Sequence, residues 1–113
     1  MQVILKSDSV EYHNASSCTA IEYPSNEKDI NIAGIIINGR YPETGLAYNK
    51  VCKLMAYVVK GSGKLVVESL EVVLNIGDVV TINPMEKYYW EGSMELIMPS
   101  VPAWTPDQYI HEE

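Results

Sequence analysis

Apolar residues in this chain recur in short β-branched runs between turn-forming residues, and not at the helical spacing i, i+3, i+4 and i+7. The predicted strands are residues 30–38, 54–60, 64–68, 71–74, 79–82, 88–91 and 94–98. We expect the glycine-rich residues 61–63 to form a hairpin loop, and residues 75–78 and 92–93 to form later reversals. Short strands at this spacing predict an all-β chain, folded as an antiparallel sandwich or barrel.

The two ends of the chain are patterned differently from its centre. Residues 3–5 and 18–23 are candidates for short edge strands, and the polar stretches between them are typical of loops. Near the other end, Thr105 is a candidate N-cap, Pro106 suits the first helical position, and Gln108 completes a capping box. We therefore expect one helical turn there, which would let Trp104 pack on the barrel.

These patterns fit a single domain. We assign residues 1–29 to N-terminal edge strands and loops, residues 30–100 to the barrel core, and residues 101–113 to a tail that packs on the barrel. A length of 113 residues is typical of one domain with a modest hydrophobic core.

The net charge of −7 narrows the classes of partner, because an acidic protein repels nucleic-acid phosphates and anionic lipid. We therefore expect neither nucleic-acid nor membrane binding. Residues 1–14 lack the apolar run of a secretory signal, which predicts a cytoplasmic protein. Cys18 and Cys52 are too few for a disulfide scaffold, so we expect both to be reduced and structural.

Three of the predicted strands are apolar at consecutive positions, within residues 30–37, 54–59 and 71–74. An antiparallel sheet with one wet face would alternate apolar and polar residues, so part of the outer face is expected to be covered. A homodimer is the simplest cover. The alternative is that residues 1–29 fold back over the sheet.

Two segments resemble motifs of the cupin family of small barrels. Residues 56–63 (AYVVKGSG) are similar to its Tyr-Val-x-x-Gly-x-Gly motif, and residues 76–84 (IGDVVTINP) are similar to its Gly-Asp-x-x-x-Ile-Pro motif. The likeness extends over roughly residues 30–108. It implies an antiparallel jelly-roll, cupin-like barrel with at most one short C-terminal helical turn.

The resemblance also locates the positions where metal-binding cupins carry three histidines and a glutamate. Counted from Gly61 and Gly77, these positions hold residues that do not form such a site: Leu54, Tyr88, and either Ala47 with Asn49 or Tyr48 with Lys50. A divalent transition metal needs about three converging nitrogen, sulfur or carboxylate donors. We therefore expect no metal and no cofactor.

The same alignment predicts that Leu54 and Tyr88 point into the barrel, and strand alternation adds Ala56, Val58 and Trp90. Two interpretations remain open for this aromatic interior. Tyr88 and Trp90 either fill the space that a metal would occupy, or line a pocket in which their polar tips orient a ligand.

The loop at residues 39–45 carries the remaining candidates. Arg40 could hold a carboxylate or phosphate, and Glu43 could act as an acid or base. Alternatively, the two side chains form a salt bridge at the rim of little energetic consequence. Lys50 adds positive potential beside this loop.

Three functions follow from these observations. The first is a metal-free barrel that binds a small polar or carbohydrate-like ligand, with these candidate contacts: Arg40, Asn49, Lys50, Tyr88 and Trp90. The second is a structural or regulatory homodimer with a filled barrel. The third is a metal-independent sugar isomerase or epimerase, with Tyr88 as the acid and Glu43 or His13 as the base.

Overall fold

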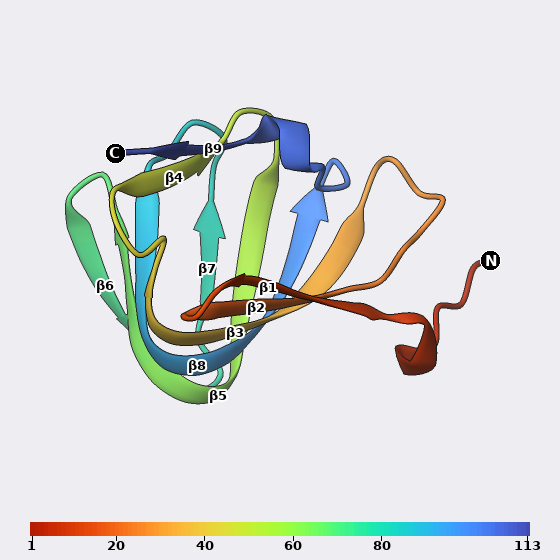
Figure 1. The fold of residues 1–113 in the computed structure, drawn as a ribbon, viewed down its shortest axis with the longest axis horizontal. Helices are drawn as coiled ribbons and strands as arrows, with labels where there is room; N and C mark the ends of the chain where they lie inside the picture. Colours follow the sequence, from red (N-terminus) through yellow and green to blue (C-terminus); the bar gives the residue numbers. More distant parts are fainter.

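The computed structural model describes residues 1–113 and contains one antiparallel sheet of nine strands (Figure 1). The strands are β1 (Val10–Ala15), β2 (Cys18–Glu22), β3 (Asn31–Tyr41), β4 (Leu46–Asn49), β5 (Lys53–Val67), β6 (Leu70–Leu74), β7 (Val79–Ile82), β8 (Tyr88–Val101) and β9 (Tyr109–Glu112). Two 3-10 turns, η1 (Lys6–Asp8) and η2 (Pro106–Gln108), complete the chain. Neither is long or apolar enough to cross a membrane. The predicted all-β class is confirmed, and η2 is the predicted C-terminal turn.

The strand order explains how the sheet curls into a barrel. Strands β1, β2, β3 and β8 are neighbours in that order, β5 pairs with β8, and β6 and β7 pair with different parts of β5. The shorter β4 and β9 pair with each other and reach β8 through a single residue pair. In Figure 1 the long strands curve around one side of the molecule, and β4, β9 and η2 lie across the opposite side. The interior is enclosed between these two sides.

The predicted hairpin at residues 61–63 is wrong. Strand β5 continues through these residues and pairs with β8 from Lys53 to Val67. The reversal predicted at residues 92–93 is wrong for the same reason, because β8 is also continuous there. Gly61 has a φ of 78°, and a Cβ at this position would overlap the carbonyl oxygen of Ser93 on β8. This glycine therefore allows two bent strands to approach closely, and does not form a turn.

The chain ends also differ from expectation in part. Residues 3–5 form no strand, whereas β1, β4 and β9 were not predicted. The predicted capping box is wrong, because Thr105 makes no side-chain cap hydrogen bond. The Gln108 side chain is buried instead, and its Oε1 accepts hydrogen bonds from the backbone N–H groups of Val51 (3.3 Å) and Cys52 (3.1 Å).

The hydrophobic core follows the alternation of β5 and β8. Leu54, Ala56 and Val58 are buried, as are Tyr88 and Trp90, so the predicted inward register is confirmed. The alternate residues of β5 face outward and remain exposed although they are apolar, Met55, Tyr57 and Val59 among them. Two apolar faces on one strand therefore do occur here, and the outer one is not covered by residues 1–29 along β5.

Candidate functional site: an aromatic cavity

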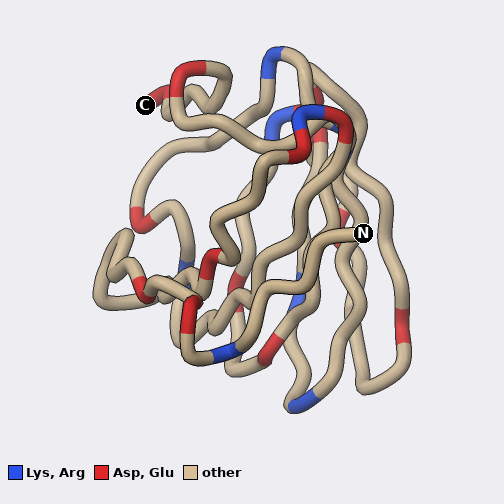
Figure 2. Tube along the Cα trace, turned by 90° about the vertical axis from the view of Figure 1, so that its right-hand side faces the viewer, with Lys and Arg blue, Asp and Glu red and all other residues tan.

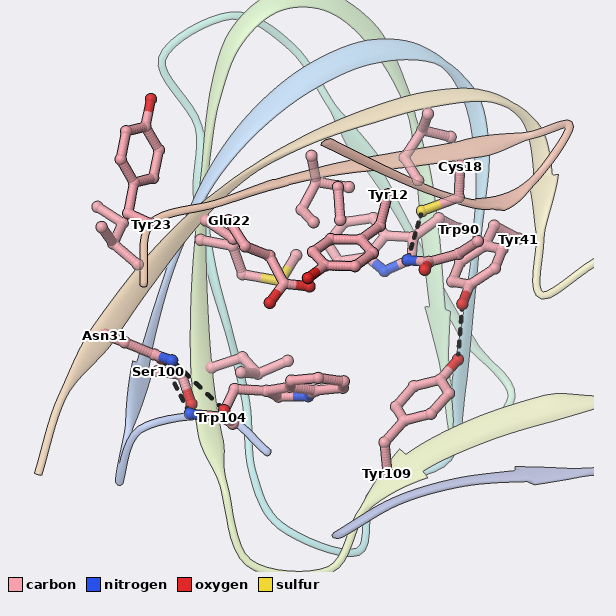
Figure 3. A pocket seen from close by; sticks show the side chains of 18 of the residues that line it. Tyr12, Cys18, Glu22, Tyr23, Asn31, Tyr41, Trp90, Ser100, Trp104 and Tyr109 are labelled. Carbon is pink, nitrogen blue, oxygen red and sulfur yellow. Dashed lines mark hydrogen bonds between the residues drawn. The ribbon is translucent and has the colours of Figure 1, made fainter. Parts of the chain in front are cut away.

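An open cavity of about 440 Å³ lies between the inner faces of β1 to β3 and the segment that carries Trp104 and Tyr109 (Figure 3). Strand register creates its sheet side, because Tyr12, Ala20 and Ile35 are paired across β1, β2 and β3 and share one face. Fifteen of its 22 lining residues are hydrophobic. Size and composition are those of a small-molecule site.

Aromatic side chains enter the cavity from both sides. Figure 3 shows Tyr12, Tyr41 and Trp90 on the sheet side, and Trp104 and Tyr109 on the opposite side. The rings of Trp104 and Tyr109 are tilted at 54° with centroids 5.9 Å apart. Aromatic faces opposed across an open space are suited to hold a flat ring or the apolar face of a sugar.

A buried hydrogen-bond network holds the Trp104 side in place. Asn49 Oδ1 accepts hydrogen bonds from Trp104 Nε1 (3.1 Å) and Gln108 Nε2 (2.8 Å), and Asn49 Nδ2 donates to the Tyr88 hydroxyl (3.4 Å). Asn31 fixes the backbone of Trp104 through its N–H (2.9 Å) and its carbonyl oxygen (3.4 Å). The indole is therefore positioned before any ligand enters.

Tyrosine hydroxyls supply the neutral polar groups of the cavity. The Tyr109 hydroxyl donates to that of Tyr41 at 3.3 Å. Burial raises the pKa of Tyr41, Tyr88 and Tyr109, so all three remain protonated near neutral pH. They can act as hydrogen-bond donors or acceptors, and they are poor bases.

Glu22 and Glu27 are the only charged residues that line the cavity. Glu22 is half-buried on β2, and its carboxylate points into the cavity beside Tyr12 in Figure 3. Burial raises the pKa of Glu22, and no hydrogen bond or ion pair offsets this effect. Elsewhere the basic residues are interspersed with acidic ones, as Figure 2 shows. The cavity therefore offers a free carboxylate and no cation.

Cys18 lies in the cavity wall, and its thiol is buried. Burial raises its pKa to about 11, and a long contact from Asn14 Nδ2 (4.0 Å) opposes the shift only weakly. A thiol with this pKa is almost entirely protonated near neutral pH, which makes it a poor nucleophile. Cys18 therefore acts as an apolar residue of the cavity wall. Cys52 does not line the cavity and is buried in the hydrophobic core.

The residues predicted from sequence fall into two groups. Tyr88 and Trp90 line the cavity, and their rings meet edge to face at 6.3 Å. Asn49 is 1% exposed and lies behind the cavity wall in the network described above, with no surface among the lining residues. The structure thus brings these three together, with Asn49 in a supporting position.

The predicted charged candidates lie outside the cavity. Arg40 donates hydrogen bonds to the carbonyl oxygens of Pro42 (2.7 Å) and Gly45 (3.0 Å), and its guanidinium stacks on the Tyr89 ring at 3.9 Å. Glu43 accepts from the Ser16 hydroxyl instead of pairing with Arg40.

The other two candidates, Lys50 and His13, are exposed. Lys50 lies at the surface beyond the end of β4. His13 lies beside Glu11, with 3.6 Å between His13 Nε2 and the carboxylate. Neither residue lines the cavity, and neither does Arg40 or Glu43.

The positions that hold metal ligands in metal-binding cupins do not fit a metal here. Ala47 and Leu54 are buried hydrocarbon side chains, and the Tyr88 hydroxyl is hydrogen-bonded to Asn49. No three His, Cys, Asp or Glu side chains lie close enough together to hold a metal ion. The donor set required for a transition metal is therefore missing.

Sequence reasoning missed five of the residues that line the cavity as ligand contacts, namely Tyr12, Glu22, Tyr41, Trp104 and Tyr109. Tyr12 and Glu22 belong to the N-terminal segment, in which β1 pairs with β2 and β2 pairs with β3, so that the curled sheet extends beyond β3. The sequence does contain one indication of this arrangement. Cys18, Ala20 and Glu22 are alternate residues of one predicted strand, so the carboxylate of Glu22 shares a strand face with two small apolar residues.

The chain matches no protein-family model and no curated protein sequence. Among solved structures it is similar to Streptomyces Pac13, a nucleoside dehydratase, with a TM-score of 0.89 and 18% identity over 100% of this chain and 92% of that one. Three Pac13 variants with uridine give the same score of 0.89.

Two further structures show the same relationship. KdgF from Halomonas sp. has a TM-score of 0.75 and 13% identity, over 95% of this chain and 97% of its own. An RmlC-like cupin from Shewanella frigidimarina has a TM-score of 0.73 and 17% identity, over 91% of each chain. At these identities the likeness shows the fold, which is that of a small cupin barrel.

Proposed function

We propose that this small cupin barrel binds an uncharged, polar, ring-containing ligand of nucleoside or monosaccharide size. The open aromatic cavity carries the proposal, because a barrel that serves only as a scaffold has no need of about 440 Å³ of space lined by fixed aromatic rings. The prediction of a small polar or carbohydrate-like ligand is retained in this form.

The similarity to Pac13 supports a nucleoside over a simple sugar. Variants of that Streptomyces protein were solved with uridine, and their fold covers the whole of this chain. A flat base between Trp104 and the sheet-side aromatic rings would use the stacking surfaces, and the hydroxyls of Tyr41 and Tyr109 would bond polar groups at its edge. Uridine is therefore the first compound to test.

Intrinsic fluorescence provides a direct assay, because both tryptophans of the chain, Trp90 and Trp104, line the cavity. We expect uridine, cytidine or adenosine to change the emission in a saturable way and to raise the melting temperature. Glucose and ribose serve as the comparison for the sugar alternative.

A blocked cavity provides the matched control. Ala33 lines the cavity on β3, so Ala33→Phe should fill it and abolish the response. Val73 is 68% exposed on β6 and does not line the cavity, so Val73→Phe should leave the response intact. Absence of saturable binding by every nucleoside and sugar, or equal binding by Ala33→Phe, contradicts the proposal.

A further inference from the structure

The charge of the cavity separates two kinds of ligand that the proposed function alone does not distinguish. No lysine, arginine or histidine is among the 22 lining residues, and the two charged groups, Glu22 and Glu27, are both acidic. A phosphate monoester carries close to two negative charges near neutral pH. Placing it here would desolvate those charges without a compensating cation and beside a carboxylate.

Glu22 differs from Glu27 in its surroundings. Glu22 is half-buried on β2, which lies between β1 and β3. These two strands carry the cavity-lining residues Tyr12 and Ala33. Glu27 lies in the loop that follows β2, and it is exposed. A carboxylate that is partly removed from water and has no partner in the protein has acceptor capacity available for a ligand.

The chemistry that matches this acceptor is a pair of neighbouring hydroxyl groups. The two oxygens of one carboxylate can accept from two hydroxyls of a vicinal diol, and such charge-assisted bonds are stronger than neutral ones. The same pairing of an acidic side chain with ribose hydroxyls is used in dinucleotide-binding sites. In Figure 3 the Glu22 carboxylate faces the open space across from Trp104, so a stacked base and its ribose could reach both groups.

We propose that Glu22 is the specificity-determining residue of the cavity: it accepts hydrogen bonds from the 2′ and 3′ hydroxyls of a nucleoside and excludes nucleoside phosphates. This inference rests on the proposed function and deepens it, because it names the ligand class as an unphosphorylated ribonucleoside. The hydrogen bonds between Glu22 and the ligand's diol contribute affinity, and the charge of Glu22, which no cation in the cavity offsets, contributes the selectivity against phosphates.

The experiment is isothermal titration of the full chain with uridine, 2′,3′-dideoxyuridine and uridine 5′-monophosphate. For the wild type we expect uridine to bind at least about tenfold more tightly than either other compound, which corresponds to about 1.4 kcal/mol. Glu22→Gln keeps the shape of the side chain but loses the charge and one acceptor. It should weaken uridine binding about tenfold and reduce the gap between uridine and its monophosphate.

The matched control is Glu11→Gln, which removes an exposed carboxylate of β1 outside the cavity and should leave all three affinities within about twofold. Equal wild-type affinities for uridine and its monophosphate, or for uridine and the dideoxy compound, would overturn the role of Glu22 while leaving the proposed function intact. Failure of all nucleosides and sugars to bind overturns both proposals. The wild-type titrations decide the question even where Glu22→Gln folds poorly.

Discussion

Replacing Asn49 by alanine tests whether this residue supports the cavity or contacts the ligand. Its side chain is 1% exposed and serves three groups, because its carbonyl oxygen accepts from Trp104 and Gln108 and its amide donates to Tyr88. Asn49→Ala therefore leaves two N–H donors without an acceptor, one on the buried Gln108 and one on the partly buried Trp104. It also leaves a small void behind the indole.

The expected loss of stability in Asn49→Ala can be worked out from the two N–H donors that lose their acceptor. An unsatisfied buried polar group costs about 1–3 kcal/mol, so the buried Gln108 donor and the partly buried Trp104 donor together predict a loss of about 3 kcal/mol in the free energy of unfolding. The longer bond to Tyr88, at 3.4 Å, adds little. This loss is a large fraction of the stability of a domain of 113 residues.

Urea denaturation followed by tryptophan fluorescence measures the effect, with Asn26→Ala as the control. Asn26 is exposed, and its replacement should change stability by less than about 0.5 kcal/mol. A loss below about 1 kcal/mol in Asn49→Ala would refute the network argument. Unchanged stability with lost ligand affinity would instead make Asn49 a direct ligand contact, as the sequence alone predicts.

Three further predictions follow from the fold. Gly61→Ala should cost at least about 1 kcal/mol more in chemical denaturation than Gly77→Ala, because both glycines have positive φ but only Gly61 lies against a neighbouring strand; equal losses would contradict this. In a Cys52→Ser background, Cys18 should react with a disulfide reagent at pH 8 about 100-fold more slowly in the folded protein than in urea. The reason is that burial raises the pKa of Cys18 to about 11. Similar rates in the two conditions would contradict the burial of Cys18. Light scattering should show a dimer that Tyr57→Lys converts to a monomer, because the exposed apolar outer face of β5 is the surface that a second copy would cover; a monomeric wild type would contradict the proposed homodimer.

Strand alternation predicted the buried residues correctly where one face of a strand packs into the core. Leu54, Ala56 and Val58 alternate with exposed residues, and their burial could be predicted from the sequence alone. The short strand β7 and the turn before it were also predicted, since an Asn-x-Gly-Asp reversal and a following Asn-Pro bound it on both sides. Local chemistry determined these elements.

The sequence was misleading where a distant strand decides the local structure. Gly61 to Gly63 has the composition of a hairpin loop, yet β8 pairs along the whole of β5 and keeps the chain extended. Gln108 has the spacing of a capping residue, yet its side chain is buried. It forms hydrogen bonds with the Asn49 side chain and with the backbone just before β5. Such long-range partners leave no trace in the local pattern of residues.

The candidate site was only half predictable for a related reason. Tyr88 and Trp90 belong to a strand whose inward register was known, so their place in the cavity wall could be derived. Glu22 and Tyr12 reach the cavity because β1 and β2 extend the sheet beyond β3, and Trp104 does so because the buried network holds it there. Neither arrangement can be inferred from one segment at a time.

The cavity is assembled from residues near opposite ends of the described chain, with Tyr12 and Glu22 on one wall and Trp104 and Tyr109 on the other. A molecule held between them acts as a noncovalent cross-link between segments that are joined only through the whole barrel. Its binding energy is therefore coupled to global unfolding and not to the opening of a single loop. Occupancy should consequently protect even distant parts of the barrel from proteases that cut the unfolded chain.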